Sequence, residues 1–183
     1  MGSIQKAKLF FIAFSLTATL GSIKAGTSCG TDGSVAQRIQ QCKETCDFET
    51  SNRQFISWHL VARTSWGKEV WYDPINQKIW SDQSSYRYTF ENSKNICETG
   101  AIGREQTAYI HGYWKLPRQW EYRKASNFGL LSCLPGLQLT DLWVKGFSDT
   151  DRIVFNGSTG RFSTIPQRSF SQYYIRCAMD VRL

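Results

Sequence analysis

Six cysteines constrain the fold of this chain more than any other feature of its sequence. They are Cys29, Cys42, Cys46, Cys97, Cys133 and Cys177. An even number of cysteines in an exported chain favours disulfides over metal ligands, and six cysteines allow 15 pairings. The chain has no Cys-x-x-Cys pair, and its two histidines lie far from the cysteines in the sequence. The pattern therefore predicts a disulfide-stapled domain rather than a zinc site.

The first 25 residues have the pattern of a secretory signal peptide. Lys6 and Lys8 precede the apolar run Leu9–Leu20, and the small residue Ala25 lies at the expected cleavage site. The run is too short for a comfortable membrane span. We therefore expect an exported protein without a transmembrane segment. Lipidation at Cys29 stays an open alternative, although the apolar residue expected three positions upstream of a lipidated cysteine is missing.

The charge and composition exclude several classes of protein. The formal net charge is +7, and three of these charges belong to Lys6, Lys8 and Lys24, so the mature protein carries +4. No run of five like charges exists, which argues against a nucleic-acid partner. A mild positive charge suits anionic glycans or membrane surfaces, and equally an ordinary protein surface. An aromatic content of 14% supplies enough apolar area to exclude general disorder.

Hydrophobic periodicity predicts three helices, over residues 34–47, 89–98 and 118–128. In the first, Ser34 can cap the N-terminus, and one stripe holds Val35, Ile39, Cys42 and Cys46. Because Cys42 and Cys46 would lie one turn apart on one face, we expect each to bond outward rather than to the other.

The pattern from residue 55 onward is typical of β-strands. Runs of β-branched and aromatic residues predict strands over 55–61, 69–72, 78–80, 142–144, 152–155, 160–163 and 172–181. Asn156-Gly157 predicts the turn of a hairpin, because both residues tolerate a positive φ. Two helices followed by a β-rich half indicate an α+β fold.

Several sequence phrases resemble, in order, those of one known family. Val70–Trp80 is similar to its opening phrase, Thr89–Cys97 to its first helix, and Gly112–Pro117 with Glu121 to its Trp-Arg-Leu-Pro…Glu signature. Three further features of this chain resemble the closing strands of the family: Trp143, the hairpin Phe155-Asn156-Gly157 and the strand Tyr173–Cys177. The family is the Lcl C-terminal-type domain of bacterial surface adhesins, which is related to C-type lectin-like and sulfatase-modifying-factor folds.

The resemblance covers about Val70–Arg182 and implies a C-type lectin-like α+β fold. In that fold two helices pack on small antiparallel sheets with long loops, here stapled by disulfides and preceded by an N-terminal helix. The expected organisation is a signal peptide (1–25), an N-terminal cysteine-containing helix and linker (26–66) and the lectin-like domain (67–183). The resemblance also implies a disulfide between Cys97 and Cys177, while the pairing of the other four cysteines stays open.

The resemblance implies an exported bacterial binding module or adhesin, in the periplasm, on the cell surface or secreted. Such a module would recognise a glycan or an envelope or cell-surface protein, without catalysis and without a required cofactor. Two other functions remain as hypotheses: an enzyme related to the sulfatase-modifying fold, and a structural component of the envelope.

The loops in residues 136–163 are the expected ligand-binding region, since long loops are least constrained by the core. The candidate ligand-binding residues are Trp143, Lys145, Arg152 and Arg161, where arginine would form charge-assisted hydrogen bonds and tryptophan would stack. Trp66 is a second tryptophan next to a loop. The alternatives are a solvated hairpin with ordinary surface charges and core positions for both tryptophans.

Two further kinds of site have candidate residues. Asp149, Asp151 and Asn156 offer the oxygen ligands that calcium prefers, although aspartates of this kind also form turns. His111 and Cys133 can be drawn as a nucleophile pair, but an exported Cys133 is expected to be oxidised. No Gly-x-Ser-x-Gly, Walker or His-Glu-x-x-His motif is present. The sequence therefore favours a protein that is not an enzyme.

Overall fold

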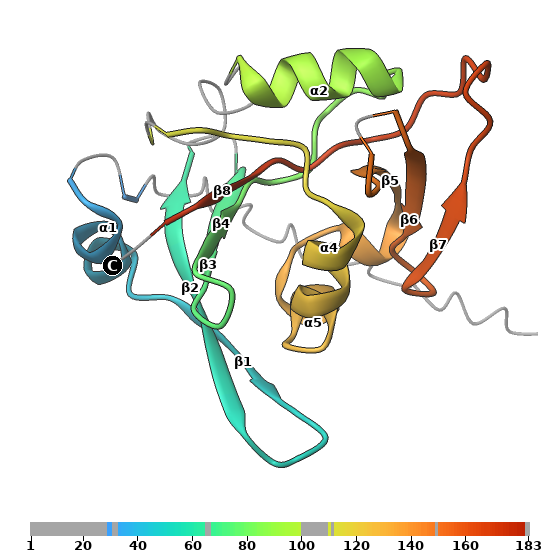
Figure 1. The fold of residues 1–183 in the computed structure, drawn as a ribbon. Helices are drawn as coiled ribbons and strands as arrows, with labels where there is room; N and C mark the ends of the chain where they lie inside the picture. The colour runs from blue at the N-terminus through green and yellow to red at the C-terminus, as the bar shows by residue number, and fades with distance from the viewer. Residues whose placement is uncertain are drawn as a thin grey trace, which may run out of the picture.

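The computed structural model describes residues 29, 30, 33–64, 67–99, 110, 112–148 and 150–181. It has an α+β architecture with two antiparallel sheets and short helices (Figure 1). The elements are α1 (Val35–Cys42), β1 (Thr45–Glu49), β2 (Phe55–Arg63), β3 (Glu69–Asp73), β4 (Lys78–Trp80), α2 (Phe90–Glu98), α4 (Gln119–Ser126), α5 (Leu130–Cys133), the 3-10 helix η1 (Leu137–Leu139), β5 (Asp141–Lys145), β6 (Arg152–Asn156), β7 (Arg161–Thr164) and β8 (Ala178–Asp180). The expected signal peptide lies outside the described residues.

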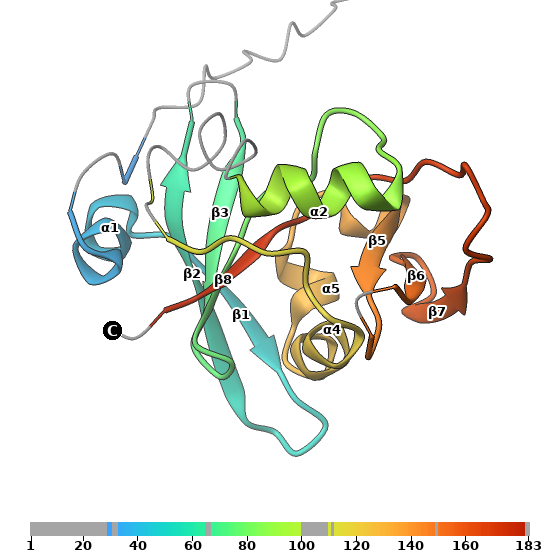
Figure 2. The same ribbon diagram turned by 45° about the horizontal axis from the view of Figure 1, so that its top comes forward.

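The larger sheet has the strand order β1-β2-β3-β4-β8, and the smaller sheet has the order β5-β6-β7. Figure 2 shows that the β1–β2 hairpin extends beyond the body of the molecule. Since β2 pairs with β3, the larger sheet continues across the domain boundary expected after residue 66. Residues 45–63 are therefore part of this sheet and not a linker.

The N-terminal helix is shorter than its sequence pattern predicts. Ser34 caps it: the Ser34 Oγ accepts a hydrogen bond from the Gln37 N–H, and the Gln37 side chain accepts one from the Ser34 N–H. The helix ends at Cys42, and Lys43 adopts a left-handed conformation with φ 56°. From Thr45 the chain pairs with β2 instead, so the predicted continuation of the helix to residue 47 is wrong.

The other two helices form where the sequence predicts them. Thr89 caps α2 by accepting a hydrogen bond from the Asn92 N–H. At α4, the Glu121 carboxylate accepts a hydrogen bond from the Arg118 N–H. Gly129 follows with φ 102°, a left-handed conformation that favours glycine, and α5 begins directly after it.

Three disulfides join distant segments of the chain. They pair Cys29 with Cys42, Cys46 with Cys133, and Cys97 with Cys177. The last is the pairing that the resemblance implies, and it links α2 to the residue before β8. Cys42 and Cys46 each bond to another partner and not to one another.

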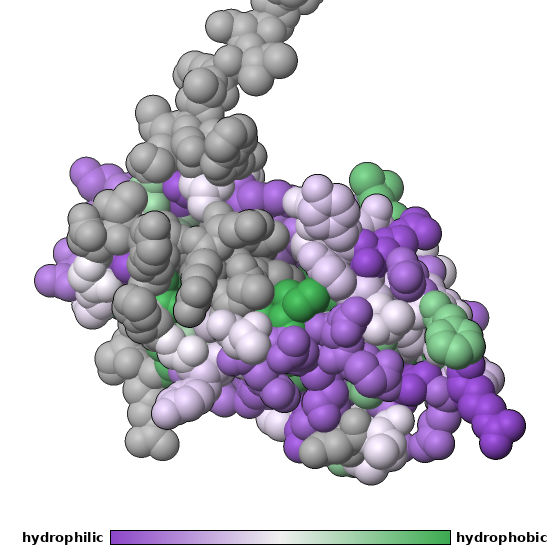
Figure 3. Space-filling view, turned by 90° about the horizontal axis from the view of Figure 1, so that it is seen from above, coloured by the Kyte–Doolittle hydropathy of each residue, from purple (hydrophilic) through white to green (hydrophobic). Residues whose placement is uncertain are grey.

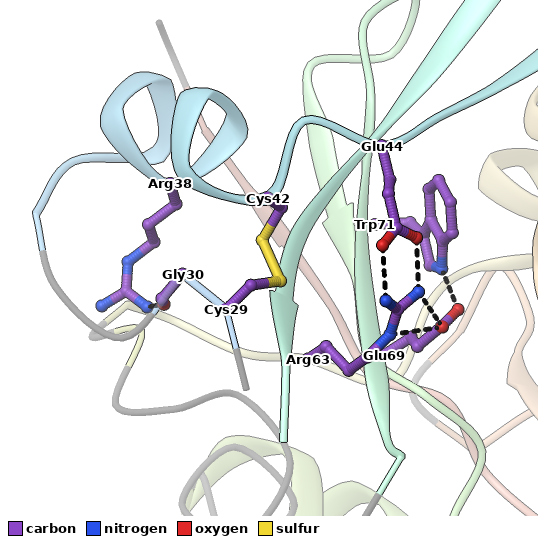
Figure 4. The surroundings of a disulfide bond; sticks show 8 residues. All are labelled: Cys29, Gly30, Arg38, Cys42, Glu44, Arg63, Glu69 and Trp71. Atoms are coloured by element: carbon purple, nitrogen blue, oxygen red, sulfur yellow. Dashed lines mark hydrogen bonds and ion pairs between the residues drawn. A yellow bond between two sulfur atoms is a disulfide. The ribbon is translucent and has the colours of Figure 1, made fainter. Parts of the chain in front are cut away.

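Figure 4 shows the surroundings of the Cys29–Cys42 disulfide, close to the end of β2. The Arg63 guanidinium lies between two carboxylates there, and it donates to Glu44 and, at 2.9 Å from Nε to Oε1, to Glu69. Glu69 in turn accepts a hydrogen bond of 3.0 Å from the Trp71 indole. Cys29 and Arg63 also exchange backbone hydrogen bonds of 3.0 and 3.1 Å, which fasten the first described residues to the larger sheet.

The helices α4 and α5 lie between the two sheets (Figures 1 and 2). Tyr122 of α4 is fully buried, and its ring lies 5.1 Å from the Trp80 ring of the larger sheet and 4.9 Å from the Phe155 ring of the smaller one. Trp114 and Leu116 are buried as well, in a second part of the core beneath α2. Through Tyr122, aromatic packing therefore links α4 to both sheets.

Residues 173–180, which we call the closing segment, join the two sheets. The Trp143 N–H of β5 donates to the Tyr174 carbonyl at 2.9 Å, and β8 at the other end pairs with β4. Only Ala178–Asp180 form a regular strand within the strand predicted over 172–181. None of the described helices is both long and apolar enough to cross a membrane.

Candidate functional site

A cavity of about 430 Å³ opens at the end of the smaller sheet, where β5 begins and β6 ends. We call it the tyrosine cavity. Its lining residues come from four separate stretches of the chain, and they are Arg87, Gln138, Leu139, Thr140, Asp141, Asn156, Ser158, Tyr173 and Tyr174. Its volume falls within the range of small-ligand sites in proteins.

The closing segment brings these stretches together. Tyr173 and Tyr88 exchange backbone hydrogen bonds of 2.9 and 3.1 Å, which places Arg87 beside the closing segment. The neighbouring residue Tyr174 pairs with Leu142 of β5. Two residues next to each other in sequence thus connect the chain before α2 to the smaller sheet.

One wall of the cavity holds a stacked cation. The Arg87 guanidinium lies 5.1 Å from the centre of the Tyr174 ring, at the distance of a cation–π contact. Tyr174 is half-buried and packs against the hydrophobic core, whereas Arg87 is exposed. Within the described part of the chain, no carboxylate forms an ion pair with Arg87.

Another part of the cavity lining is a fixed pair of polar side chains. Asn156 donates from Nδ2 to Oδ1 of Asp141 at 2.7 Å, across the β5–β6 ladder. The side-chain Oδ1 of Asn156 accepts hydrogen bonds from the Ser158 hydroxyl and from both the N–H and the hydroxyl of Thr159. Both polar atoms of the Asn156 side chain therefore already have hydrogen-bond partners within the β5–β6 pair and the turn that follows β6. By contrast, Oδ2 of Asp141 has no donor among the described residues.

Trp143 is not a ligand-binding residue in this structure. Its side chain is 0% exposed, and its indole N–H donates to the Tyr88 carbonyl. Its ring packs edge-on against Phe90 at 5.4 Å and against Tyr173 at 4.8 Å. The expectation that Trp143 stacks on a ligand is wrong because its ring is part of the core. Trp66 lies outside the described residues.

The three cationic candidates do not form one site. Lys145 and Arg152 are paired at one end of the β5–β6 ladder, and Arg161 lies beside Asn156 at the other. Arg152 forms an ion pair with Glu91 of α2 and donates to the Ser169 carbonyl at 3.2 Å, so it holds the smaller sheet against α2. Arg161 is exposed on β7, and neither arginine lines the tyrosine cavity.

The expected calcium ligands are also separated. Asp151 immediately precedes β6, and Asn156 ends this strand, so roughly 16 Å of extended chain lie between them. The Asp151 carboxylate instead accepts a hydrogen bond of 2.9 Å from the Ser148 N–H, which lowers the pKa of Asp151. Asp149 lies outside the described residues, and the rest hold no cluster of three metal-binding side chains. Asp151 and Asn156 cannot bind one ion together.

The structure does not support His111 and Cys133 as a nucleophile pair. Cys133 is bonded to Cys46 and is therefore not a nucleophile in this structure. His111 lies outside the described residues. The other histidine, His59, is half-buried on β2 with its ring 6.5 Å from that of Tyr72.

A buried arginine that sequence reasoning did not single out stabilises the closing segment. Arg176 is 0% exposed, and it donates to the carbonyl of Ser81 at 2.8 Å and to that of Pro135. Asp82 lies 3.4 Å from its guanidinium. Burial lowers the pKa of Arg176, and the nearby Asp82 acts in the opposite direction. Its contacts are structural because they lie inside the protein.

A scan of the chain against protein-family models finds no match, and a search of curated proteins finds no relative. The likeness to the Lcl C-terminal-type domain is therefore a hypothesis that rests on the sequence phrases quoted above.

Proposed function

We propose that this protein is an exported, non-catalytic binding module, adhesin-like in role, that recognises a glycan in the tyrosine cavity. The observation that carries the proposal is the combination of groups in one cavity. Tyr173 and Tyr174 supply aromatic surface, and the other lining residues supply a guanidinium, a carboxylate, amides and hydroxyls. A sugar presents both apolar faces that stack on aromatic rings and hydroxyls that bond to such polar groups.

One structural finding and one expectation from the sequence support export. Three disulfides form within the described residues, and stable disulfides are typical of oxidising compartments. The signal peptide that the sequence predicts would direct the chain to such a compartment. We place the protein in the bacterial periplasm, on the cell surface or in the medium.

We also propose that the fold is C-type lectin-like. Support comes from two helices, α2 and α4, that accompany small antiparallel sheets, and from the disulfide between the first of these helices and the last strand region. The expected ligand-binding loops, in residues 136–163, supply six of the residues that line the tyrosine cavity.

The other two functions have less support. The nucleophile pair that could be drawn for an enzyme needs the Cys133 thiol, and this sulfur is bonded to Cys46. A purely structural role would favour a large apolar surface for assembly. On the coloured part of the face in Figure 3, most side chains are hydrophilic and the hydrophobic ones lie in small separate patches.

Binding of the oxidised protein to immobilised oligosaccharides tests the proposal. Tyr174→Ala should weaken binding at least tenfold, while Tyr174→Phe, which keeps the ring, should retain most of it. Tyr86→Ala is the matched control, because Tyr86 is 73% exposed and lies next to Arg87 in sequence, but does not line the cavity. Melting temperatures of all variants separate loss of binding from loss of folding. Failure to bind any saccharide, or equal losses in the Tyr174→Ala and Tyr86→Ala variants, would overturn the proposal.

A further inference from the structure

We infer that the glycan carries a carboxylate, and that Arg87 forms a bidentate ion pair with this group. The class of ligand is thus an acidic saccharide, such as a chain of uronic acids. This inference rests on the proposed function of the tyrosine cavity and specifies its ligand.

Arg87 and Arg152 both stack on aromatic rings, but among the described residues only Arg152 is paired with a carboxylate. The Arg152 guanidinium lies 6.0 Å from the centre of the Phe90 ring, and Glu91 pairs with it. The Arg87 guanidinium lies over Tyr174 in a similar way, but no described carboxylate pairs with it. Stacking occupies the face of a guanidinium and leaves its N–H groups at the edge, where they match the two oxygens of a carboxylate.

Asp141 supplies a second polar group to the cavity. Asp141 holds the side-chain amide of Asn156 with one oxygen, and its other oxygen can accept a hydroxyl proton. A saccharide that directs its carboxylate to Arg87 and its hydroxyls to Asp141 would bind both of these lining residues. A dianionic phosphate would suffer about twice the repulsion from Asp141 that a carboxylate with a single charge suffers at the same distance. Asp141 therefore favours a group with a single negative charge over a phosphate.

The experiment uses the oxidised protein with immobilised polygalacturonate, which carries one carboxylate per sugar. The same polymer after chemical reduction of its carboxyl groups is the neutral comparison. Wild-type protein should bind polygalacturonate at least tenfold more tightly than the reduced polymer. Arg87→Gln should weaken binding to polygalacturonate at least tenfold and abolish this preference. Arg161→Gln, which changes an exposed arginine outside the cavity, should stay within twofold of wild type.

Several outcomes would overturn the inference. It fails if Arg87→Gln binds polygalacturonate as wild type does, or if the reduced polymer binds equally well. Equal binding to polyglutamate would assign the site to acidic peptides rather than saccharides. Binding to neutral saccharides alone, lost in Tyr174→Ala, would remove only this inference and leave the proposed function standing. Binding to no saccharide at all would remove both.

Discussion

Lys78 and Glu121 form an ion pair inside the domain, with 2.6 Å between the Lys78 Nζ and the Glu121 Oε1. The two side chains are only 4% and 1% exposed. Lys115 and Asp180 extend the pair into a cluster, in which the Lys115 Nζ lies 3.3 Å from Glu121 and 2.7 Å from the Oδ2 of Asp180. This charge cluster connects β4, α4 and β8.

Removal of Glu121 should be strongly destabilising. In Glu121→Ala the Lys78 ammonium group stays buried and loses its closest buried partner, and such a change costs about 3–5 kcal/mol. The free energy of urea unfolding at neutral pH measures it. Glu91→Ala breaks the more exposed pair with Arg152 and should cost about 1 kcal/mol or less. Equal losses in the two variants would show that burial does not set the strength of these pairs.

The charge cluster also predicts a loss of stability in acid. Burial raises the pKa of Asp180, but hydrogen bonds from Lys115 and Lys78 outweigh it and hold the pKa below its ordinary value. The folded state therefore binds this proton more weakly than the unfolded state does. The stabilisation is complete above the unfolded-state pKa of about 3.9 and is lost as the pH falls through the folded-state value.

Urea midpoints measured across this pH range test the prediction. Asp180→Asn should lower the midpoint at neutral pH and make its fall in acid shallower. Asp73 acts in the opposite direction: burial raises its pKa, so its protonation in acid favours the folded state. An acid decline that is as steep in Asp180→Asn as in wild type would assign the decline to other carboxylates.

Two of the disulfides should differ clearly in their contribution to stability. The Cys97–Cys177 bond spans 80 residues and the Cys29–Cys42 bond spans 13. The chain-entropy model assigns them about 4.5 and about 3 kcal/mol. Replacement of both cysteines of a pair by alanine, followed by thermal unfolding, should rank the variants in this order. Peptide mapping of the unreduced protein should recover Cys97 linked to Cys177, and free thiols at both positions would contradict the structure.

The Trp114–Leu116 segment offers a sharp comparison of buried and exposed neighbours. Trp114→Ala and Leu116→Ala should each cost about 3 kcal/mol, because both side chains lie in the core. Tyr113 directly precedes them and is 98% exposed, so Tyr113→Ala should change stability by less than about 0.5 kcal/mol. A wild-type melting temperature for either core variant would show that this segment does not pack as described.

Local signals in the sequence predict most of the helices and strands. The caps at Ser34 and Thr89 satisfy the first N–H groups of their helices, and this requires only neighbouring residues. The end of α1 could not be predicted in the same way. Cys46 continues the helical stripe in sequence, but residues 45–49 gain a full ladder with β2, and that contact is not local. Tertiary pairing here outweighs helical periodicity.

The candidate site was harder to predict than the fold. Trp143 lies close to loops in sequence, yet its ring is buried, because β5 is covered on both faces and Leu142, Trp143 and Val144 are all buried. The tyrosine cavity combines Arg87 with residues about 50 to 90 positions later in the chain. Their proximity depends on the pairing of Tyr173 with Tyr88, for which neither residue type nor spacing gives a signal.

The location of the closing segment determines when this domain can finish folding. Without residues 173–180, β8 is missing from the larger sheet and the backbone bond to Trp143 cannot form. The closing segment follows all the strands that it joins, so a growing chain can complete both sheet contacts only after the rest of the domain has been synthesised. Cys177 lies in the same segment and is the last of the six cysteines, so the bond that ties α2 to this segment cannot form before the segment itself is made.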